Sequence, residues 1–170
     1  MAVTLRDART LSDDRAWIRA RYRDYVSELS VSKSGLFPAL GEWDARESEF
    51  LTGWFADLTS HPFVILEHGA RVGFALVTRT PGGTRHRLSE FFIVSPARRR
   101  GIGNVAATLL LTRFAGEWEI VEDEHNRAAL AFWRRVIGTL TGGRYRETHA
   151  GGEVRHLFEV SGRPLTQPAG

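Results

Sequence analysis

The 170-residue sequence contains no cysteine, one methionine and one lysine, Lys33. Without cysteine the chain cannot form a disulfide, use a thiol as nucleophile or build a cysteine metal site. No apolar run approaches the roughly 20 residues that a membrane-spanning helix needs. Residues 1–7 also lack the apolar segment of a secretory signal. We therefore expect a cytoplasmic protein with no membrane partner.

The remaining composition is that of an ordinary folded domain, with 42% hydrophobic and 25% charged residues. We expect a single domain over residues 1–161 and a flexible C-terminal tail over 162–170, which contains two prolines. The net charge is +3, but acidic residues are interspersed among the arginines and no nucleic-acid motif is present. The excess charge suits a polyanionic cofactor. No histidine or carboxylate spacing indicates a metal site.

Hydrophobic periodicity predicts a mixed α/β order with four helices and about seven strands. Ser12 is a candidate N-cap for the first helix, and Gly138 is expected to end the last one. The third strand of a central antiparallel meander and the strand after the next helix form a strand–helix–strand unit, so we expect that pair to be parallel. The predicted strands are 3–9, 63–67, 72–78, 88–94, 117–122, 144–149 and 154–160, and the predicted helices are 12–29, 44–58, 105–114 and 128–137.

The stretch Val94–Asn104 separates the central strand from the third helix and carries three arginines followed by Gly101-Ile-Gly103. Glycine lets a main chain approach a ligand closely, because it has no Cβ. The helix that starts there directs unpaired N–H groups and the positive end of its dipole at the loop. This pattern predicts a phosphate or pyrophosphate site, although a solvated basic loop with a glycine turn has the same composition.

Two cofactor classes fit this loop. Gly101–Ala106 matches the dinucleotide fingerprint G-x-G-x-x-A, with Glu122 or Asp123 about 20 residues further on. In that fingerprint, however, the strand runs directly into the first glycine, whereas here residues 95–100 intervene. Three adjacent arginines also suit a phosphate-rich tail better than a ribose, which favours the pyrophosphate loop of an acyl-coenzyme A transferase.

The chain resembles the GNAT N-acetyltransferase family at two places. Arg98–Gly103, after an apolar-x-Pro turn, fits the family signature Q/R-x-x-G-x-G/A, and Asn126–Trp133 resembles its second signature, N-x-x-A-x-x-F-Y. The resemblance implies a mixed sheet with an antiparallel N-terminal meander and one parallel pair splayed at the cofactor site. It also implies transfer of acetyl from acetyl-CoA to a primary amine by direct attack.

The resemblance also implies the residues that hold acetyl-CoA. Its arm would pair with the strand edge like an added strand, and the Val94 amide would stabilise the thioester oxyanion. Trp133 stands where many relatives have a tyrosine that protonates the departing thiolate. An indole is no practical acid, so water would supply that proton. The predicted cofactor-binding residues are Phe92, Ile93, Val94, Arg98, Arg99, Arg100, Gly101, Ile102, Gly103, Asn104, Asn126 and Trp133.

Glu90 is the first candidate for the catalytic base. A carboxylate inside an apolar strand is expected to have a raised pKa, although a salt bridge or an exposed strand position would also explain it. Glu122 is the second candidate, and His149 and His156 are expected to be structural or exposed.

The sequence does not identify the acceptor beyond a small-molecule or peptide amine, and relatives often form homodimers. Two alternative functions remain open. One is an NAD(P)-type dinucleotide-binding oxidoreductase. The other is a non-catalytic acyl-CoA-binding sensor, because Trp133 replaces the usual tyrosine.

Overall fold

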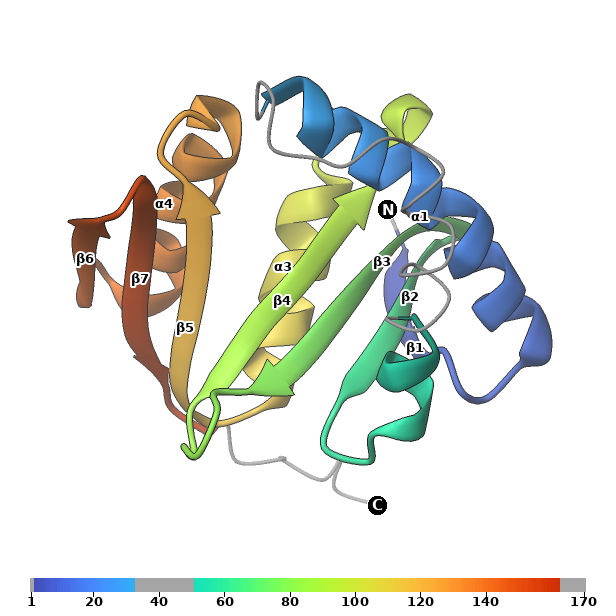
Figure 1. Cartoon of the computed structure of the whole chain (residues 1–170), viewed down its shortest axis with the longest axis horizontal. Helices are drawn as coiled ribbons and strands as arrows, with labels where there is room; N and C mark the ends of the chain where they lie inside the picture. Colours follow the sequence, from blue (N-terminus) through green and yellow to red (C-terminus); the bar gives the residue numbers. More distant parts are fainter. Residues whose placement is uncertain (1, 33–50, 163–170) are drawn as a thin grey trace, which may run out of the picture.

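A twisted seven-stranded sheet forms the middle of the computed structural model (Figure 1). The structure describes residues 2–32 and 51–162. Residues 51–56 are helical, as predicted, whereas 44–50 and most of the predicted tail lie outside the described residues. The elements are β1 (Val3–Asp7), α1 (Ser12–Ser32), β2 (His61–Glu67), β3 (Ala70–Arg79), β4 (His86–Ile93), α3 (Ile102–Arg113), β5 (Gly116–Asp123), α4 (Arg127–Thr141), β6 (Tyr145–Ala150) and β7 (Glu153–Val160), with a 3-10 turn at Ser95–Ala97.

The strand order is β1-β2-β3-β4-β5-β7-β6, and only β4 and β5 are parallel neighbours. The predicted meander and the predicted parallel pair are therefore confirmed. The pairing of β4 with β5 covers only His86–Leu88 against Trp118–Ile120. Beyond these residues the two strands diverge, as Figure 1 shows. Among the described residues, the divergence leaves one edge of β4 without a neighbouring strand over its second half.

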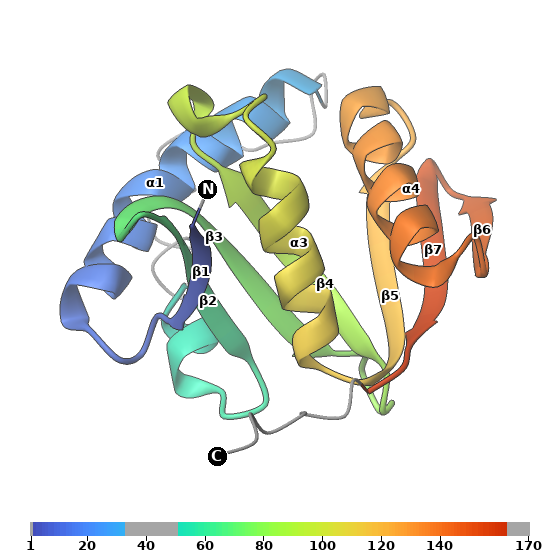
Figure 2. The same ribbon diagram turned by 180° about the vertical axis from the view of Figure 1, so that it is seen from behind.

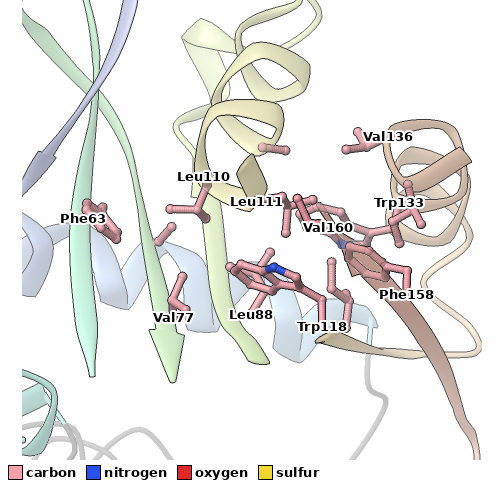
Figure 3. Packing of buried hydrophobic residues seen from close by; sticks show 14 residues of the cluster. Phe63, Val77, Leu88, Leu110, Leu111, Trp118, Trp133, Val136, Phe158 and Val160 are labelled. Carbon is pink, nitrogen blue, oxygen red and sulfur yellow. The ribbon is translucent and has the colours of Figure 1, made fainter. Parts of the chain in front are cut away.

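Helices cover the two faces of the sheet separately (Figure 2). On β2, Phe63 packs in the cluster that contains residues of α3 and α4, whereas Val64 packs against α1. The alternation follows from the period of two along a strand. Figure 3 shows the first cluster, in which the fully buried Trp118 lies beneath α3 and α4. Burial of one such large side chain contributes about 2–3 kcal/mol to folding.

A buried ion cluster fixes the start of α1 against the sheet. The side chain of Asp14 is fully buried and accepts hydrogen bonds from Arg6 Nε and Arg71 Nε, each at 2.7 Å. The bond from Arg6, followed by that from Arg71, outweighs burial and lowers the pKa of the Asp14 carboxyl. The carboxylate thereby joins α1 to β1 and β3.

The predicted end of the last helix is wrong. α4 continues through Gly138 to Thr141, because Ile137 and Thr141 are buried and extend its apolar face. Gly142 ends the helix in the left-handed conformation with φ 62°, and the Gly143 N–H donates to the Gly138 carbonyl at 2.9 Å. This is the usual glycine C-cap geometry.

Candidate active site

The divergence of β4 from β5 opens a cleft of about 490 Å³ on the α3 and α4 side of the sheet. Its floor comes from the two strands, and its walls come from the loop before α3 and from one face of α4. The lining residues are Leu88, Phe91, Phe92, Ile93, Arg98, Arg99, Gly101, Gly103, Asn104, Ile120, Val121, Asn126, Ala129, Phe132, Trp133 and Arg135.

The loop before α3 has the backbone that its glycines predict. Arg99 and Gly101 both have positive φ, at 60° and 81°, and Gly101 is the N-cap of α3. The first amides of the helix, from Ile102 onward, have no acceptor within the helix and therefore point out of its N-terminus. A Cβ added at Gly103 would lie 3.5 Å from Phe132 of α4, so the helix start lies directly against the wall of the cleft. The loop presents donors and a positive dipole end to anything bound there.

The three consecutive arginines differ in their contacts. Arg98 donates from Nε to the Ile93 carbonyl at 2.7 Å and forms a 2.6 Å salt bridge with Glu28 of α1. Arg100 pairs with Glu67 at 2.9 Å. In residues 2–32 and 51–162, Arg99 has no salt bridge. Of the three side chains, that of Arg99 is the one without a competing carboxylate in this part of the chain.

Arg135 of α4 is a cleft residue that no sequence motif marked. Its guanidinium carbon lies 5.9 Å from the centre of the Phe132 ring, and that ring is the neighbour of Gly103. In the part of the chain that the structure describes, Arg135 forms no salt bridge. Arg99 and Arg135 therefore carry positive charge into the cleft from two different elements.

Nine of the twelve predicted cofactor residues line the cleft, and three do not. Ile102 is fully buried in a cluster with Val3 and Ile65, and Arg100 is held by Glu67. Val94 lines a separate groove between α1 and the start of the loop. The cleft residues missing from the prediction are mainly apolar strand and helix positions, which a motif does not distinguish from core.

The predicted role of the Val94 amide is wrong. The Val94 N–H donates to the Val72 carbonyl of β3 at 2.9 Å, so it is already engaged. Hydrogen-bonded residues alternate along an antiparallel pair, and the register Gly73↔Ile93 and Ala75↔Phe91 places the main-chain groups of Ile93 and Phe91 on the other edge. That edge faces the cleft. The Ile93 carbonyl there accepts from Arg98, and the amides of Phe91 and Ile93 have no partner strand in the described sheet.

Asn126 and Trp133 place α4 against this edge. The Asn126 side chain caps the helix by accepting from the Ala129 N–H at 3.2 Å, as predicted, and its Nδ2 donates to Glu122 at 3.2 Å. Trp133 is buried, with ring centres 5.2 Å from Phe91 and 4.8 Å from Phe132. The indole therefore packs as part of the aromatic wall of the cleft.

A β-bulge places Glu90 on the opposite face of the sheet from the cleft wall. The register passes from Leu76↔Glu90 to Val77↔Leu88, so Ser89 is an extra residue without a partner in β3. Without the bulge, Glu90 would share a face with Leu88, which packs beneath α3 and α4. The extra residue turns the Glu90 side chain toward α1 instead. There the Glu90 carboxylate and the Tyr25 hydroxyl lie close enough to interact.

The other candidate bases lie in different surroundings. Glu122 accepts hydrogen bonds from Asn126 Nδ2 and from the Asp123 N–H, both at 3.2 Å. His149 and His156 both contact Glu147, at 2.8 and 2.9 Å, on the α4 side of β6 and β7. His149 is exposed and His156 is fully buried, and neither lines the cleft.

The comparisons with known proteins agree with this geometry. The family model "Acetyltransferase (GNAT) family" matches residues 19–139, which is more than half of the chain. The chain belongs to the GNAT acetyltransferase family. Acetyl transfer is therefore its general activity, and no curated protein matches the chain closely enough to narrow it.

Solved structures show the same fold at low identity. An acetyltransferase from Thermus thermophilus aligns with a TM-score of 0.70 at 16% identity, covering 94% of this chain and 98% of its own. The PaiA N-acetyltransferase of Thermoplasma acidophilum, solved in complex with coenzyme A, aligns with a TM-score of 0.63 at 11% identity. The alignment covers 94% of this chain and 99% of that one. The Campylobacter jejuni N-acetyltransferase PseH, solved in complex with acetyl coenzyme A, aligns with a TM-score of 0.58 at 11% identity. The alignment covers 94% of this chain and 100% of that one.

The GNAT fold also decides against the dinucleotide interpretation. The sheet has one parallel pair in place of a doubly wound parallel sheet, and a 3-10 turn separates β4 from Gly101. In the described residues, no group of three histidine, aspartate or glutamate side chains is arranged to hold a metal ion. Within the same residues, no helix is both long and apolar enough to cross a membrane.

Proposed function

We propose that this chain is an acetyl-CoA-dependent N-acetyltransferase that acetylates a primary amine by direct attack on the thioester. The proposal is supported by the geometry of one gap in the sheet, which would give the two reactants separate approaches from opposite faces. The cleft at the start of α3 lies on one face of β4, and Glu90 projects from the opposite face. The open edge of β4 lies between them.

Acetyl-CoA would occupy the cleft. The pyrophosphate would accept hydrogen bonds from the amides that begin α3, with Arg99 and Arg135 supplying countercharge. The pantetheine arm would lie along the open edge at Phe91 and Ile93, like an added strand. Trp133 and Phe132 would pack against the arm. These assignments rest on the cleft lining and on the register of β4.

The chemistry would take place at the same edge. The neutral amine attacks the thioester carbon, and the carbonyl oxygen becomes an oxyanion that the amide of Phe91 or Ile93 stabilises in place of the Val94 amide. Collapse of this intermediate breaks the carbon–sulfur bond. Glu90 receives the proton that the amine loses, directly or through water, and solvent protonates the thiolate.

The first experiment separates the donor from the acceptor. Isothermal titration with coenzyme A and with NAD should give binding for coenzyme A alone, and a preference for NAD would contradict the proposal. A panel of spermidine, L-lysine, an alanine-led tetrapeptide and an aminoglycoside should then be incubated with acetyl-CoA. Mass spectrometry should detect an acetylated product for at least one of them.

Glu90→Gln tests the base. We expect turnover to fall by about 100-fold, which is the lower range for general base catalysis, with unchanged affinity for coenzyme A. An unchanged rate would remove Glu90 from the mechanism.

A non-catalytic acyl-CoA sensor is the second candidate function, and one observation favours it. Trp133 is a buried indole at the position of the tyrosine in the family signature. Tight coenzyme A binding without thiol release across the whole amine panel would favour this alternative.

A further inference from the structure

We propose that Tyr25 of α1 is the positioning residue for the base Glu90, so that α1 takes part in catalysis as well as covering the sheet. The inference rests on the proposed function, because Glu90 is a base only if an amine is acetylated. It concerns a residue outside both family signatures, on the first of the predicted helices.

The first argument is placement. Leu76 and Glu90 are direct partners in the register, and Leu76 packs in the cluster that contains residues of α1. Partners in a register share a face of the sheet, so the Glu90 side chain leaves β4 toward α1. Figures 1 and 2 both place the C-terminal half of α1 beside the end of β4. The Tyr25 hydroxyl meets the carboxylate there.

The second argument is rigidity. The Tyr25 ring lies with its centre 5.4 Å from the Phe92 ring and 5.6 Å from the Phe74 ring, the latter edge to face. Phe74 is fully buried and Phe92 nearly so. A ring held on two sides can turn only by disturbing these contacts. The hydroxyl is therefore presented to Glu90 in one orientation.

The third argument is the direction of the hydrogen bond. Burial, followed by the negative charge of Glu90 and then by Tyr22 and Glu122, raises the pKa of Tyr25 well above its ordinary value. The phenol thus keeps its proton at neutral pH and donates it to the carboxylate in a hydrogen bond. A donated hydrogen bond fixes one carboxylate oxygen and favours the ionised, proton-accepting form.

The test compares Tyr25→Phe, Glu90→Gln and the double variant, with acetyl-CoA and the best acceptor of the panel. Tyr25→Phe keeps the ring contacts and removes only the hydroxyl. We expect kcat to fall about tenfold, the effect of one hydrogen bond to a charged group, with unchanged KM for acetyl-CoA. The acid limb of the pH–rate profile should move to higher pH. The double variant should be no slower than Glu90→Gln alone.

Tyr145→Phe is the matched control, because it removes a hydroxyl from a partly buried ring on β6, outside the cleft. It should leave rate and pH profile unchanged. If Tyr25 were only structural, the rate losses of Tyr25→Phe and Glu90→Gln would multiply in the double variant, and the pH–rate profile of Tyr25→Phe would not move. Either result would overturn the inference.

A second measurement does not depend on turnover. Carbon-13 NMR titration of the Glu90 carboxyl, assigned through Glu90→Gln, should show a higher midpoint in Tyr25→Phe than in the unsubstituted protein. Identical midpoints would overturn the inference even if acetyl transfer is confirmed. An absence of thiol release by the unsubstituted protein would instead overturn the proposed function, and the catalytic role of Tyr25 with it.

Discussion

Gly103 is a position at which two substitutions can separate the requirements of the fold from those of cofactor binding. A Cβ there would meet Phe132 at 3.5 Å and Ile93 at 3.7 Å, which are ordinary contacts. Alanine is therefore compatible with the fold, whereas aspartate places a negative charge beside the amides proposed to bind pyrophosphate. We expect Gly103→Asp to weaken coenzyme A binding by at least about 100-fold, since like charges in contact cost several kcal/mol.

Gly103→Ala is the control for this prediction. Both variants should melt within a few degrees of the unsubstituted protein. Isothermal titration that gave the two variants the same affinity for coenzyme A would contradict the proposed pyrophosphate site.

The arginines of the cleft offer a second comparison at the scale of single side chains. Arg99 and Arg135 line the cleft, whereas Arg100 is paired with Glu67. We expect Arg99→Gln and Arg135→Gln each to weaken coenzyme A binding by roughly 5–20-fold, the effect of one charge-assisted contact. Arg100→Gln should change it by less than about twofold, because its charge is already engaged. Binding measured at two salt concentrations should show a weaker salt dependence only in the first two variants.

Helix α4 carries a prediction at the scale of an element. Gly138 lies inside the helix, and a Cβ there would come no closer than 4.0 Å to Tyr145. Gly138→Ala should stabilise the protein by roughly 0.5–1 kcal/mol, because alanine loses less backbone entropy in a helix. Gly142 has φ 62° at the C-cap, so Gly142→Ala should destabilise by about 1 kcal/mol. Urea unfolding of both variants checks the opposite signs, and equal signs would contradict the observed helix end.

The bulge in β4 shows how one extra residue changes the face of the sheet to which the following side chains point. Leu88 and Phe91 face the α3 and α4 side, and Glu90 faces α1, because Ser89 interrupts the alternation. The Ser89 and Thr78 hydroxyls are hydrogen-bonded at 2.6 Å, which stabilises the irregular register. An uninterrupted strand would have directed the candidate base to the side of the sheet on which the cleft lies.

At the scale of the whole molecule, the buried imidazoles of His86 and His156 and the partly buried one of His61 set how stability depends on pH. Burial is the main cause that lowers the pKa of His61, His86 and His156 below the ordinary value. The folded protein keeps these rings neutral, whereas the unfolded chain protonates them near pH 6.5. The unfolded state therefore binds more protons as pH falls through this range, and stability must fall with it.

We expect the melting temperature to drop by several degrees between about pH 7.5 and 5, with a limiting slope of about 1.4 kcal/mol per pH unit for each such ring. Hydrogen bonds, first from Arg134, lower the pKa of Glu147 to about 2, so this carboxylate is ionised throughout the range. Its contribution is lost only at lower pH. His156→Gln can retain the contact with Glu147 and should flatten the slope. Calorimetry showing constant stability would contradict the prediction.

Some features of the site could be predicted from the sequence, whereas the roles of two side chains could not. The glycine loop, the Asn126 cap and the parallel pair could be predicted, because each depends on local backbone preferences or on the short connection through one helix. Arg135 and Tyr25 could not. Their roles depend on which helix face contacts the cleft or strand β4. Helical periodicity predicts which face is buried, but it does not predict the element against which that face packs.

The sequence by itself determined the mixed α/β order, the glycine loop before α3 and the place of Glu90 on the central strand, since these follow from periodicity, glycine and helix capping. Its two signatures added the resemblance to the GNAT family. Only the tertiary structure decided which main-chain amides face the cleft, which arginines are already paired, and toward which face Glu90 projects. The physical reason is register. The pairing of β3 with β4, together with one extra residue at Ser89, fixes the direction of every later group on the strand, and no local preference in the sequence specifies that pairing.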